Sequence, residues 1–258
     1  MSINIILQAR TSSTRLPNKV LKNILGKAML EHQLLRLSQL KRVEKVIVAT
    51  SNDASDDAIE ALCDDLQTIC YRGSLNNVLD RYSQAYQHHP SEHIIRITGD
   101  CPVIDIDIIN RVIDLHLLTR ADYSSNCVPS TLPDGLDVEI FTADALLRAW
   151  QQAKKNSELE HVTIFMRSHP KLFNCQNYYH PIDYSHLRWT VDEPEDFELI
   201  TQIFKNLHPK KPFFNLTDIL DLIKKKPELT QINNSFKRNE GLLKSLRADN
   251  NTIHHSKD

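Results

Sequence analysis

The sequence predicts an α/β fold of three layers (α/β/α), in which helices cover both faces of a mainly parallel sheet. Three short apolar runs rich in β-branched residues are typical of strands buried on both faces, and they span residues 3–8, 45–50 and 93–98. Amphipathic segments of helical period lie between these runs, at 28–41, 54–66 and 76–88. This alternation favours a parallel sheet, because parallel strands need a crossover connection.

The other elements follow in chain order. The run 68–71 predicts a further strand, and a helix over 105–118 begins behind Cys101-Pro102, where Asp105 or Asp107 is suited to cap its first turn. The pattern then becomes mixed, with strands predicted at 136–141, 173–179 and 186–190 and helices at 142–154, 157–168, 194–206 and 215–225. Residues 1–230 are therefore expected to form one domain. Residues 231–258 are polar and Asn-rich, which predicts a flexible C-terminal tail.

Composition limits the classes of function. The chain has 258 residues, 41% hydrophobic and 25% charged, with a formal net charge of −2. A chain so nearly neutral has no general field for nucleic acid or an anionic membrane, so any anion site must be local. No apolar run is long enough to span a bilayer. Five scattered cysteines without a C-x-x-C pair, and no export signal, indicate reduced thiols in a cytoplasm.

The loop after the first predicted strand carries a cluster of cations. The stretch LQARTSSTRLPNK, residues 7–19, places Arg10, Arg15 and Lys19 among small hydroxyl residues. Open parallel sheets bind ligands at the carboxyl ends of their strands, and Arg forks with a Lys charge suit a polyphosphate. A single surface Arg is more often solvated or paired with an acid, but three cations within ten residues favour a phosphate site. The loop is not a Walker A motif, because it lacks that motif's glycines.

Two carboxylates at other strand ends could hold a metal ion. Asp100 follows the strand at 93–98, and Asp192 stands before the helix at 194–206. Carboxylates are the ligands that Mg²⁺ prefers, although Asp192 taken alone is better explained by capping or a place in the first turn of that helix. Cations for a triphosphate together with two carboxylates on a metal describe nucleotidyl transfer, in which pyrophosphate leaves against the cations.

Six motifs in order along the chain resemble one known family. They are QARTSSTRLPNKVL, RGSLNNVLDRY, IIRITGDCPVID, LPDGLDVEIF, ELEHVT and RWTVDEPEDFELI. Over residues 3–225 the chain resembles the spore coat polysaccharide biosynthesis protein F family, which is cytidylyltransferase-like and has the nucleotide-diphospho-sugar transferase (GT-A-like) fold. The first and last motifs are also similar to those of 3-deoxy-manno-octulosonate cytidylyltransferases.

The resemblance implies a role for each candidate residue by its position. The nucleotide would contact Leu7, Ala9, Arg10, Ser13, Arg15, Lys19, Asp80 and Arg81. Catalysis would depend on Arg15, Lys19 and Asp100, and Mg²⁺ would bind Asp100 and Asp192. The acceptor sugar would face Asp137, Glu139, Glu160 and His161.

The chain departs from the family pattern at two loop positions. The family often has glycine where Ser12 and Asn18 stand, so the approach of the backbone to the phosphates could differ here. Relatives of this fold also often pair through the excursion from the sheet, which is segment 136–190 in this chain, and the resemblance therefore allows a homodimer.

The expected activity is transfer of CMP from CTP to a sugar or sugar acid, with release of pyrophosphate, in surface polysaccharide or glycoconjugate biosynthesis. Two alternatives remain open: a GT-A-type glycosyltransferase that uses a nucleotide sugar, and a non-catalytic nucleotide-binding scaffold protein of the same pathway. The sequence identifies neither the acceptor nor the base preference.

Three other polar features have simpler explanations. Asp105-Ile-Asp107 matches the D-x-D of metal-dependent glycosyltransferases, but its place at a helix start favours capping. Cys101 and His161 could form a nucleophilic pair, but no thiol-protease signature surrounds the cysteine. Without the resemblance, Glu160-His161 is explained equally well as a solvent-facing first turn of a helix.

Overall fold

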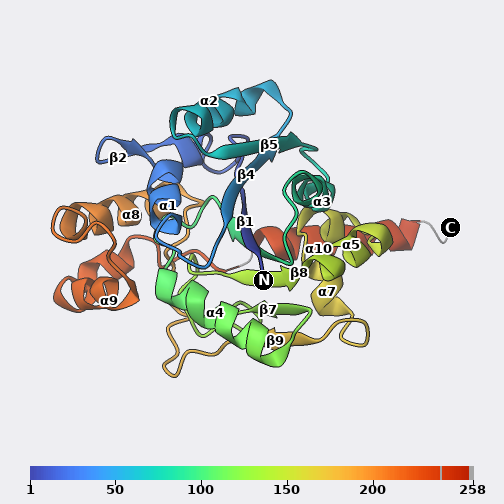
Figure 1. The fold of residues 1–258 in the computed structure, drawn as a ribbon. Helices are drawn as coiled ribbons and strands as arrows, with labels where there is room; N and C mark the ends of the chain where they lie inside the picture. The colour runs from blue at the N-terminus through green and yellow to red at the C-terminus, as the bar shows by residue number, and fades with distance from the viewer. Residues whose placement is uncertain (239, 256–258) are drawn as a thin grey trace.

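A seven-stranded sheet forms the centre of the protein in the computed structural model, which describes residues 1–238 and 240–255, with side chains described as far as residue 249 (Figure 1). The strand order is β5-β4-β1-β6-β8-β7-β9. The first half is parallel and consists of β1 (Ile3–Gln8), β4 (Lys45–Ser51), β5 (Ile69–Gly73) and β6 (His93–Thr98). The predicted mainly parallel sheet is thus confirmed.

The second half of the sheet is mixed. Strand β8 (Glu139–Thr142) is antiparallel to both β6 and β7 (Tyr123–Ser125), and β9 (Cys175–Asn177) runs parallel to β7. The predicted strand at 186–190 is wrong, because its backbone makes only an isolated bridge between Asp134 and Arg188. Strand β7 was not predicted; it is only three residues long, too short for a periodic pattern.

Helices cover both faces of the sheet, as alternate side chains of β1 show. Ile5 and Leu7 pack into one apolar cluster, and Ile6 packs into another on the opposite face. The first cluster is covered by α1 (Met29–Leu37), α2 (Asp57–Asp65), α4 (Ile106–Thr119), α8 (Pro194–Leu207) and α9 (Leu216–Lys225). The second is covered by α3 (Val78–His88), α5 (Ala143–Gln152) and α7 (Ile164–Ser168). The three layers are therefore those predicted.

Shorter elements join these layers. A small hairpin, β2 (Asn23–Ile24) with β3 (Lys27–Ala28), precedes α1, and three 3-10 turns lie at Lys19–Leu21, Ala54–Asp56 and Pro227–Gln231. The single helix predicted at 157–168 is instead two, α6 (Asn156–Glu160) and α7. The break lies at Val162, whose backbone is left-handed with φ of 51° and so cannot continue a right-handed helix.

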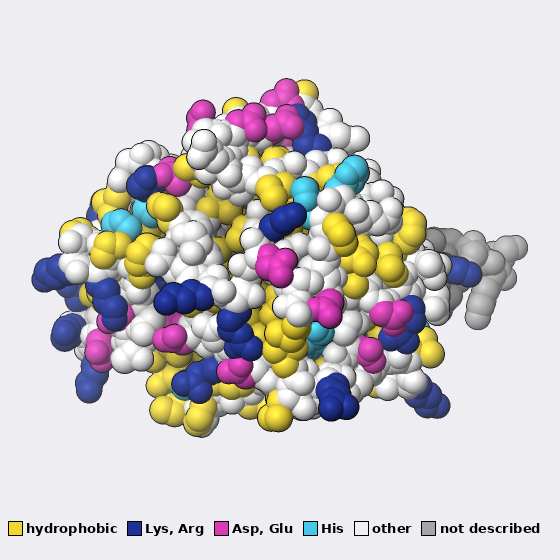
Figure 2. Space-filling model, viewed as in Figure 1, with side chains coloured by type: hydrophobic (Ala, Val, Ile, Leu, Met, Phe, Trp, Pro, Cys, Tyr) yellow, Lys and Arg dark blue, Asp and Glu magenta, His cyan; other side chains and the backbone are white. Residues whose placement is uncertain are grey.

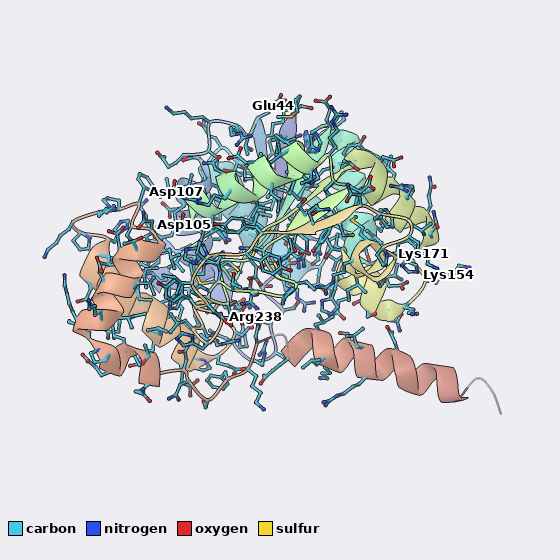
Figure 3. The ribbon with its side chains drawn as sticks, turned by 90° about the horizontal axis from the view of Figure 1, so that it is seen from below. Glu44, Asp105, Asp107, Lys154, Lys171 and Arg238 are labelled. Atoms are coloured by element: carbon cyan, nitrogen blue, oxygen red, sulfur yellow. The ribbon has the colours of Figure 1, made fainter. Side chains whose placement is uncertain are left out.

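The segment after residue 230 packs on the body over its described part. Asn233 is buried and donates to the backbone oxygen of Arg188 at 3.0 Å. Residues Glu240–His255 form helix α10, which contacts α6 and runs along one side of the molecule (Figure 3). The sequence predicted no helix here. A chain division at residue 230 and mobility of the tail stay predictions, and residues 239 and 256–258 lie outside the described residues.

The surface agrees with the nearly neutral composition. Figure 2 shows Lys and Arg side chains scattered among acidic ones over the face seen in Figure 1. Within the described part of the chain, no helix combines the length and the apolar character needed to span a bilayer. The five cysteines are all free thiols.

Candidate active site

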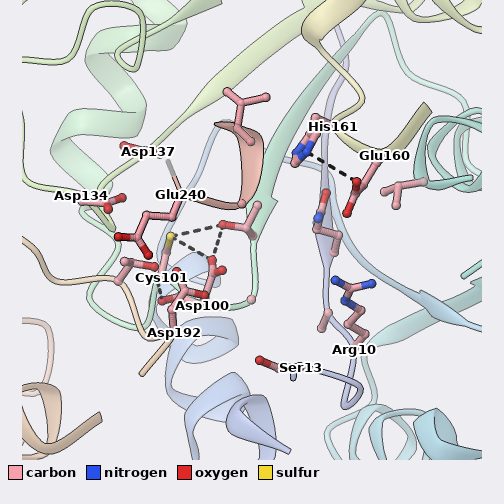
Figure 4. Close-up of a pocket in the computed structure, with 18 of the residues that line it drawn as sticks. Arg10, Ser13, Asp100, Cys101, Asp134, Asp137, Glu160, His161, Asp192 and Glu240 are labelled. Atoms are coloured by element: carbon pink, nitrogen blue, oxygen red, sulfur yellow. Dashed lines mark hydrogen bonds and ion pairs between the residues drawn. The ribbon is translucent and has the colours of Figure 1, made fainter. Parts of the chain in front are cut away.

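A cavity of about 580 Å³ opens at the carboxyl ends of β1 and β6. Its walls come from the cationic loop, from the ends of both strands, from the start of β8 and from the segment around residue 240. Figure 4 shows Asp100, Asp134, Asp137 and Asp192 gathered on one side of it, with Arg10, Glu160 and His161 on the other. The expected position at the strand ends therefore coincides with a hollow large enough for a small ligand.

The cationic loop is fixed from beneath by a buried carboxylate. Thr11 donates its backbone N–H and its hydroxyl to Asp56 Oδ1, each at 2.7 Å, and Asp56 is fully buried. Asn18 closes the loop by donating its backbone N–H to the Thr11 oxygen at 2.9 Å. These contacts direct Arg10, Ser13, Arg15 and Lys19 to the cavity wall.

The two positions that depart from the family pattern differ in backbone conformation. Asn18 is left-handed, with φ of 56° and ψ of 22°, a conformation that glycine adopts without strain and asparagine tolerates better than most residues. Ser12 has an ordinary negative φ and is exposed at the cavity wall. Glycine in relatives is thus explained sterically at position 18, and serine at position 12 meets no backbone obstacle.

Lys19 joins the two carboxylates that were expected to bind metal. Its Nζ donates to Asp100 Oδ2 at 3.2 Å, to Asp192 Oδ1 at 2.7 Å and to the backbone oxygen of Val191 at 2.7 Å. Burial alone would raise the pKa of Asp100, but the Lys19 ammonium and the Thr98 hydroxyl lower it to about 2. Burial would lower the pKa of Lys19, and the two carboxylates raise it above its usual value. Asp100 and Lys19 therefore stay charged at neutral pH.

Two arginines extend this ion-pair network. Arg15 contacts Asp192 Oδ1 and Glu193 Oε1, each at 3.0 Å. Arg188 donates two hydrogen bonds to the fully buried Asp196, at 2.9 and 2.8 Å. It also forms ion pairs with Asp134 at 3.0 Å and with Asp192 at 3.2 Å. In contrast, the Arg10 side chain is exposed and makes no ion pair with another described residue. Asp192 is thus oriented by three cations, Lys19, Arg15 and Arg188.

The pair Asp100 and Asp192 suits a hard divalent cation. Both place a carboxylate oxygen within hydrogen-bonding distance of the same point, the Lys19 nitrogen. Among the described residues, no group of three or more His, Cys, Asp and Glu side chains is arranged to hold a metal ion. Mg²⁺ in nucleotide enzymes is commonly held by one or two carboxylates together with substrate phosphates. The residues therefore fit an ion that is shared with a triphosphate.

All four expected acceptor residues lie on the cavity wall. Glu139 is anchored by Arg96 and accepts from the hydroxyls of Tyr123 and Thr163, each at 2.6 Å. Burial would raise the pKa of Glu139, but Arg96 and these hydrogen bonds lower it. A buried carboxylate held in this way stays ionised and rigid.

The other acceptor residues contact the segment that covers the cavity. Arg238 pairs with Asp137, and the Ser245 hydroxyl lies 2.9 Å from Glu160 Oε2 and 3.0 Å from His161 Nε2. Residues 237–238 and 240–249, which we term the covering segment, thus hold three of the four acceptor residues. Burial lowers the pKa of His161, although Glu160 opposes it, so this imidazole is neutral at pH 7.

Two expected nucleotide residues do not line the cavity. The Leu7 side chain is fully buried in the core, and Asp80 accepts a hydrogen bond from the Trp150 indole at 2.9 Å. Ala9 and Arg81 do line it, and Arg81 is buried with its Nη1 donating to the Ser74 oxygen at 3.1 Å. Of these four residues, Ala9 and Arg81 are thus placed to contact a ligand in the cavity.

The structure adds residues that sequence reasoning did not select. Asp134, Arg96 and Arg188 line the cavity and stand within motifs that had been recognised. Arg167, Lys237, Glu240 and Lys244 line it too, and the last three come from the expected tail, where no pattern pointed to a site. Asp134, Arg96 and Arg188 could have been selected because they lie within the motifs, whereas the residues of the expected tail are recognised only in the folded chain.

The simpler explanations hold for the remaining candidates. Asp105 caps α4 by accepting from the backbone N–H of Asp107 at 2.8 Å, and Figure 3 shows both residues at the start of that helix. Burial raises the pKa of the Cys101 thiol well above its usual value, which leaves it protonated and a poor nucleophile.

Comparison with solved structures places the chain in a known class of fold. A cytidylyltransferase from Leptospira borgpetersenii superposes with a TM-score of 0.85 and 32% identity, covering 90% of this chain and 97% of that one. A CMP:2-keto-3-deoxy-manno-octonic acid synthetase solved in complex with CTP superposes at 0.61, with 16% identity over 80% of this chain and 99% of its own. A Mycobacterium tuberculosis protein solved with manganese superposes at 0.56, with 13% identity over 78% and 99%. The fold is that of the nucleotidyltransferases.

Sequence comparison then identifies the family. The family model for cytidylyltransferases matches residues 4–241, and this chain belongs to that family. It is 36% identical to an uncharacterised protein of Methanocaldococcus jannaschii, over 92% of this chain and 97% of the relative. It is 30% identical to the spore coat polysaccharide biosynthesis protein SpsF of Bacillus subtilis, over 86% and 94%. The resemblance found in the six motifs is thus confirmed.

Proposed function

We propose that this cytidylyltransferase transfers CMP from CTP to a hydroxyl group of a sugar or sugar acid and releases pyrophosphate. The proposed setting is the cytoplasmic synthesis of a surface polysaccharide or glycoconjugate. One observation carries the assignment: three loop cations and two carboxylates from distant parts of the chain converge on a single cavity at the ends of β1 and β6. The name of the Bacillus subtilis relative supports the polysaccharide setting.

In this proposal the cationic loop binds the triphosphate. Arg10 is free to approach the phosphates, whereas Arg15 and Lys19 exchange carboxylate partners for phosphate oxygens. Ser13, Ala9 and Arg81 contribute the remaining wall of the nucleotide half. Cations placed against the leaving pyrophosphate stabilise the charge that develops as the bond to the α-phosphate breaks.

Asp100 and Asp192 would hold Mg²⁺. When bound, the ion supplies positive charge to the phosphate oxygens and lowers the barrier to attack. Thr98 and Arg188 orient the two carboxylates through hydrogen bonds at 2.5 and 3.2 Å, so both are preorganised.

The acceptor would occupy the half of the cavity bounded by Asp137, Glu139, Glu160 and His161. Anchored carboxylates and a neutral imidazole suit hydroxyl groups, because they accept or donate hydrogen bonds in fixed directions. Holding the attacking hydroxyl near the α-phosphate converts an encounter between two substrates into a reaction within one complex.

The proposal is tested by measuring pyrophosphate release with Mg²⁺ and a mixed panel of sugars and sugar acids, comparing CTP with UTP, ATP, GTP and dTTP. We expect release with CTP and one acceptor. Asp100→Asn should lower turnover by about 100-fold or more, because it removes charge needed in the transition state, while CTP affinity changes much less.

Asp107→Asn is the matched control, since Asp107 lies at the start of α4 and not on the cavity wall. Full turnover in Asp100→Asn would contradict the assignment. The glycosyltransferase alternative would be favoured if the protein used a nucleotide sugar as donor without forming pyrophosphate, and if Asp107→Asn abolished that reaction. Asp105-Ile-Asp107 would then act as the D-x-D motif of that class. CTP binding without turnover on any acceptor would favour the scaffold alternative.

A further inference from the structure

Lys19 occupies the position in which a metal ion would meet Asp100 and Asp192. Its ammonium group carries three N–H donors, and all three are used, on Asp100 Oδ2, Asp192 Oδ1 and the Val191 oxygen. Its side chain is only 11% exposed. The interaction is therefore a complete, largely desolvated cation site whose cation belongs to the chain itself.

The other carboxylate oxygens of the pair are also occupied. Asp100 Oδ1 accepts from the Thr98 hydroxyl at 2.5 Å. Asp192 Oδ1 is shared between Lys19 and Arg15, and Asp192 Oδ2 accepts from Arg188 at 3.2 Å. A divalent ion that approached these oxygens would meet the ammonium group at close range, where repulsion between like charges is strong.

A triphosphate provides an alternative partner for the same cations. Lys19 and Arg15 both line the cavity, and their carboxylate partners lie on its wall. Phosphate oxygens would compete with Asp100 and Asp192 for these cations, because both kinds of anion form charge-assisted hydrogen bonds. Each carboxylate oxygen that a cation leaves becomes available to a metal ion.

We propose that Lys19 is an internal counter-ion that closes the metal site until the nucleotide binds. In the nucleotide-free protein, Lys19 neutralises Asp100 and Asp192 and excludes the divalent cation. The triphosphate draws Lys19 to its own oxygens and thereby exposes both carboxylates to the metal. The inference depends on the proposed function for the identities of nucleotide and metal, and it adds a sequence of events: metal binds with or after the triphosphate, never ahead of it.

The test measures metal binding without any nucleotide. Mn²⁺, which has an electron paramagnetic resonance signal when free, is titrated into wild type and Lys19→Met. We expect wild type to bind Mn²⁺ at this site no more tightly than on the order of 1 mM. Lys19→Met, which keeps the length of the side chain but removes its charge, should bind at least roughly tenfold more tightly.

Two further variants show whether the tighter Mn²⁺ binding of Lys19→Met arises at this site. Lys22→Met is the matched control, because Lys22 carries the same charge three positions away and lies over the Phe197 ring, outside the cavity wall; its Mn²⁺ affinity should equal that of wild type. Adding Asp100→Asn to Lys19→Met should remove the gain. If Lys19→Met fails to fold, Lys19→Gln replaces it, since its amide retains a hydrogen-bond donor for Asp192.

Mn²⁺ binding to nucleotide-free wild type well below 1 mM, lost in Asp100→Asn, would overturn the inference, as would equal affinities in wild type and the folded Lys19 variant. These outcomes are independent of the proposed reaction. If the protein turns over CTP and its metal site also binds Mn²⁺ without nucleotide, the proposed role of Lys19 as counter-ion is rejected and the proposed function stands. If Lys19→Met tightens Mn²⁺ binding but the protein never uses CTP, the counter-ion role stands and the proposed function is rejected.

Discussion

At the scale of single residues, the charged side chains of the site pair with one another across long stretches of the chain. Arg15, Lys19, Asp100 and Asp192 were all expected at the site, and all line the cavity. Their mutual pairing was not foreseen, because a contact between residues about 170 positions apart leaves no trace in local spacing. For the same reason the burial of Asp56 beneath the loop was invisible in the sequence.

Asn18 allows the loop conformation to be tested separately from its charges. It is exposed, left-handed and without a side-chain cap, so its effect on stability comes from the backbone alone. Asn18→Ala should lower the free energy of unfolding by about 1 kcal/mol, because a Cβ without a polar group is disfavoured at positive φ. Asn18→Gly should leave it within about 0.5 kcal/mol of wild type. Urea unfolding measures both changes.

Ser12→Ala serves as the control for this comparison. Ser12 lies in the same loop, is exposed and has an ordinary φ, so its free energy of unfolding should stay at the wild-type value. Equal losses in Asn18→Ala and Asn18→Gly would show that the side chain, rather than the backbone conformation, matters at this position.

At the scale of elements, helices and strands were predicted correctly where their hydrophobic periodicity extends over many residues. They were missed or misplaced where tertiary contacts decide the conformation. The strands and helices from β1 to α4 fall within the predicted segments to within a few residues at their ends, apart from the small hairpin and the 3-10 turns. The break between α6 and α7 depends on the left-handed Val162, a residue whose side chain usually avoids that conformation. Helix α10 was missed because its stretch of the chain is polar and Asn-rich, a composition that indicates a tail more strongly than a packed helix.

Ser245 makes polar contacts that join α10 to the body of the protein. Ser245→Ala removes the contacts with Glu160 and His161. Glu160 is 45% exposed and can bond to water instead, so the net loss is that of one hydrogen bond, about 1 kcal/mol. The undocked population should rise about fivefold, and trypsin should cleave after Lys244 and Arg247 faster by the same factor.

Ser38→Ala is the control for this experiment. Ser38 donates only to the Leu35 oxygen near the end of α1, so its loss should not change cleavage of the covering segment. Unchanged cleavage in Ser245→Ala would mean that α10 is held by its other contacts, such as that between Ser157 and Asp249.

At the scale of the whole molecule, two apolar clusters on opposite faces of one sheet make the described chain a single three-layer unit. The fold class could be predicted because strand and helix periods alternate over the first hundred residues. The cavity could be located only to the strand ends, since its outer wall comes from the covering segment. A homodimer through segment 136–190 stays a prediction.

Global stability should fall in mild acid because of a buried histidine. His116 is 1% exposed, and it contacts His93 and the Ser124 hydroxyl, each at 3.0 Å. Burial, together with His93, lowers the pKa of His116 to about 4. The unfolded chain takes up a proton near pH 6.5 that the folded protein resists, so stability is lost as pH falls from about 6.5 to 4, by about 3 kcal/mol in all.

Urea unfolding at several pH values between 7 and 4 measures this loss. His116→Asn cannot titrate at this position. The slope of its free energy of unfolding against pH should therefore be smaller than that of wild type, by an amount that corresponds to the uptake of up to about one proton on unfolding. The comparison of slopes is unaffected by any constant loss of packing in the variant. Parallel pH profiles for the two proteins would show that His116 is not the group responsible.

The position of β1 also has a consequence for synthesis on the ribosome. This strand is made before the other strands of the sheet and lies between its partners β4 and β6, which follow it in the chain. Glu240 and Lys244, which complete the cavity, are made much later. Early parts of a chain generally fold first during translation. On a nascent chain the cavity should therefore lack its outer wall until residues 237–249 have been made, and the pace of translation up to that point sets how long chaperones have access to the open cavity.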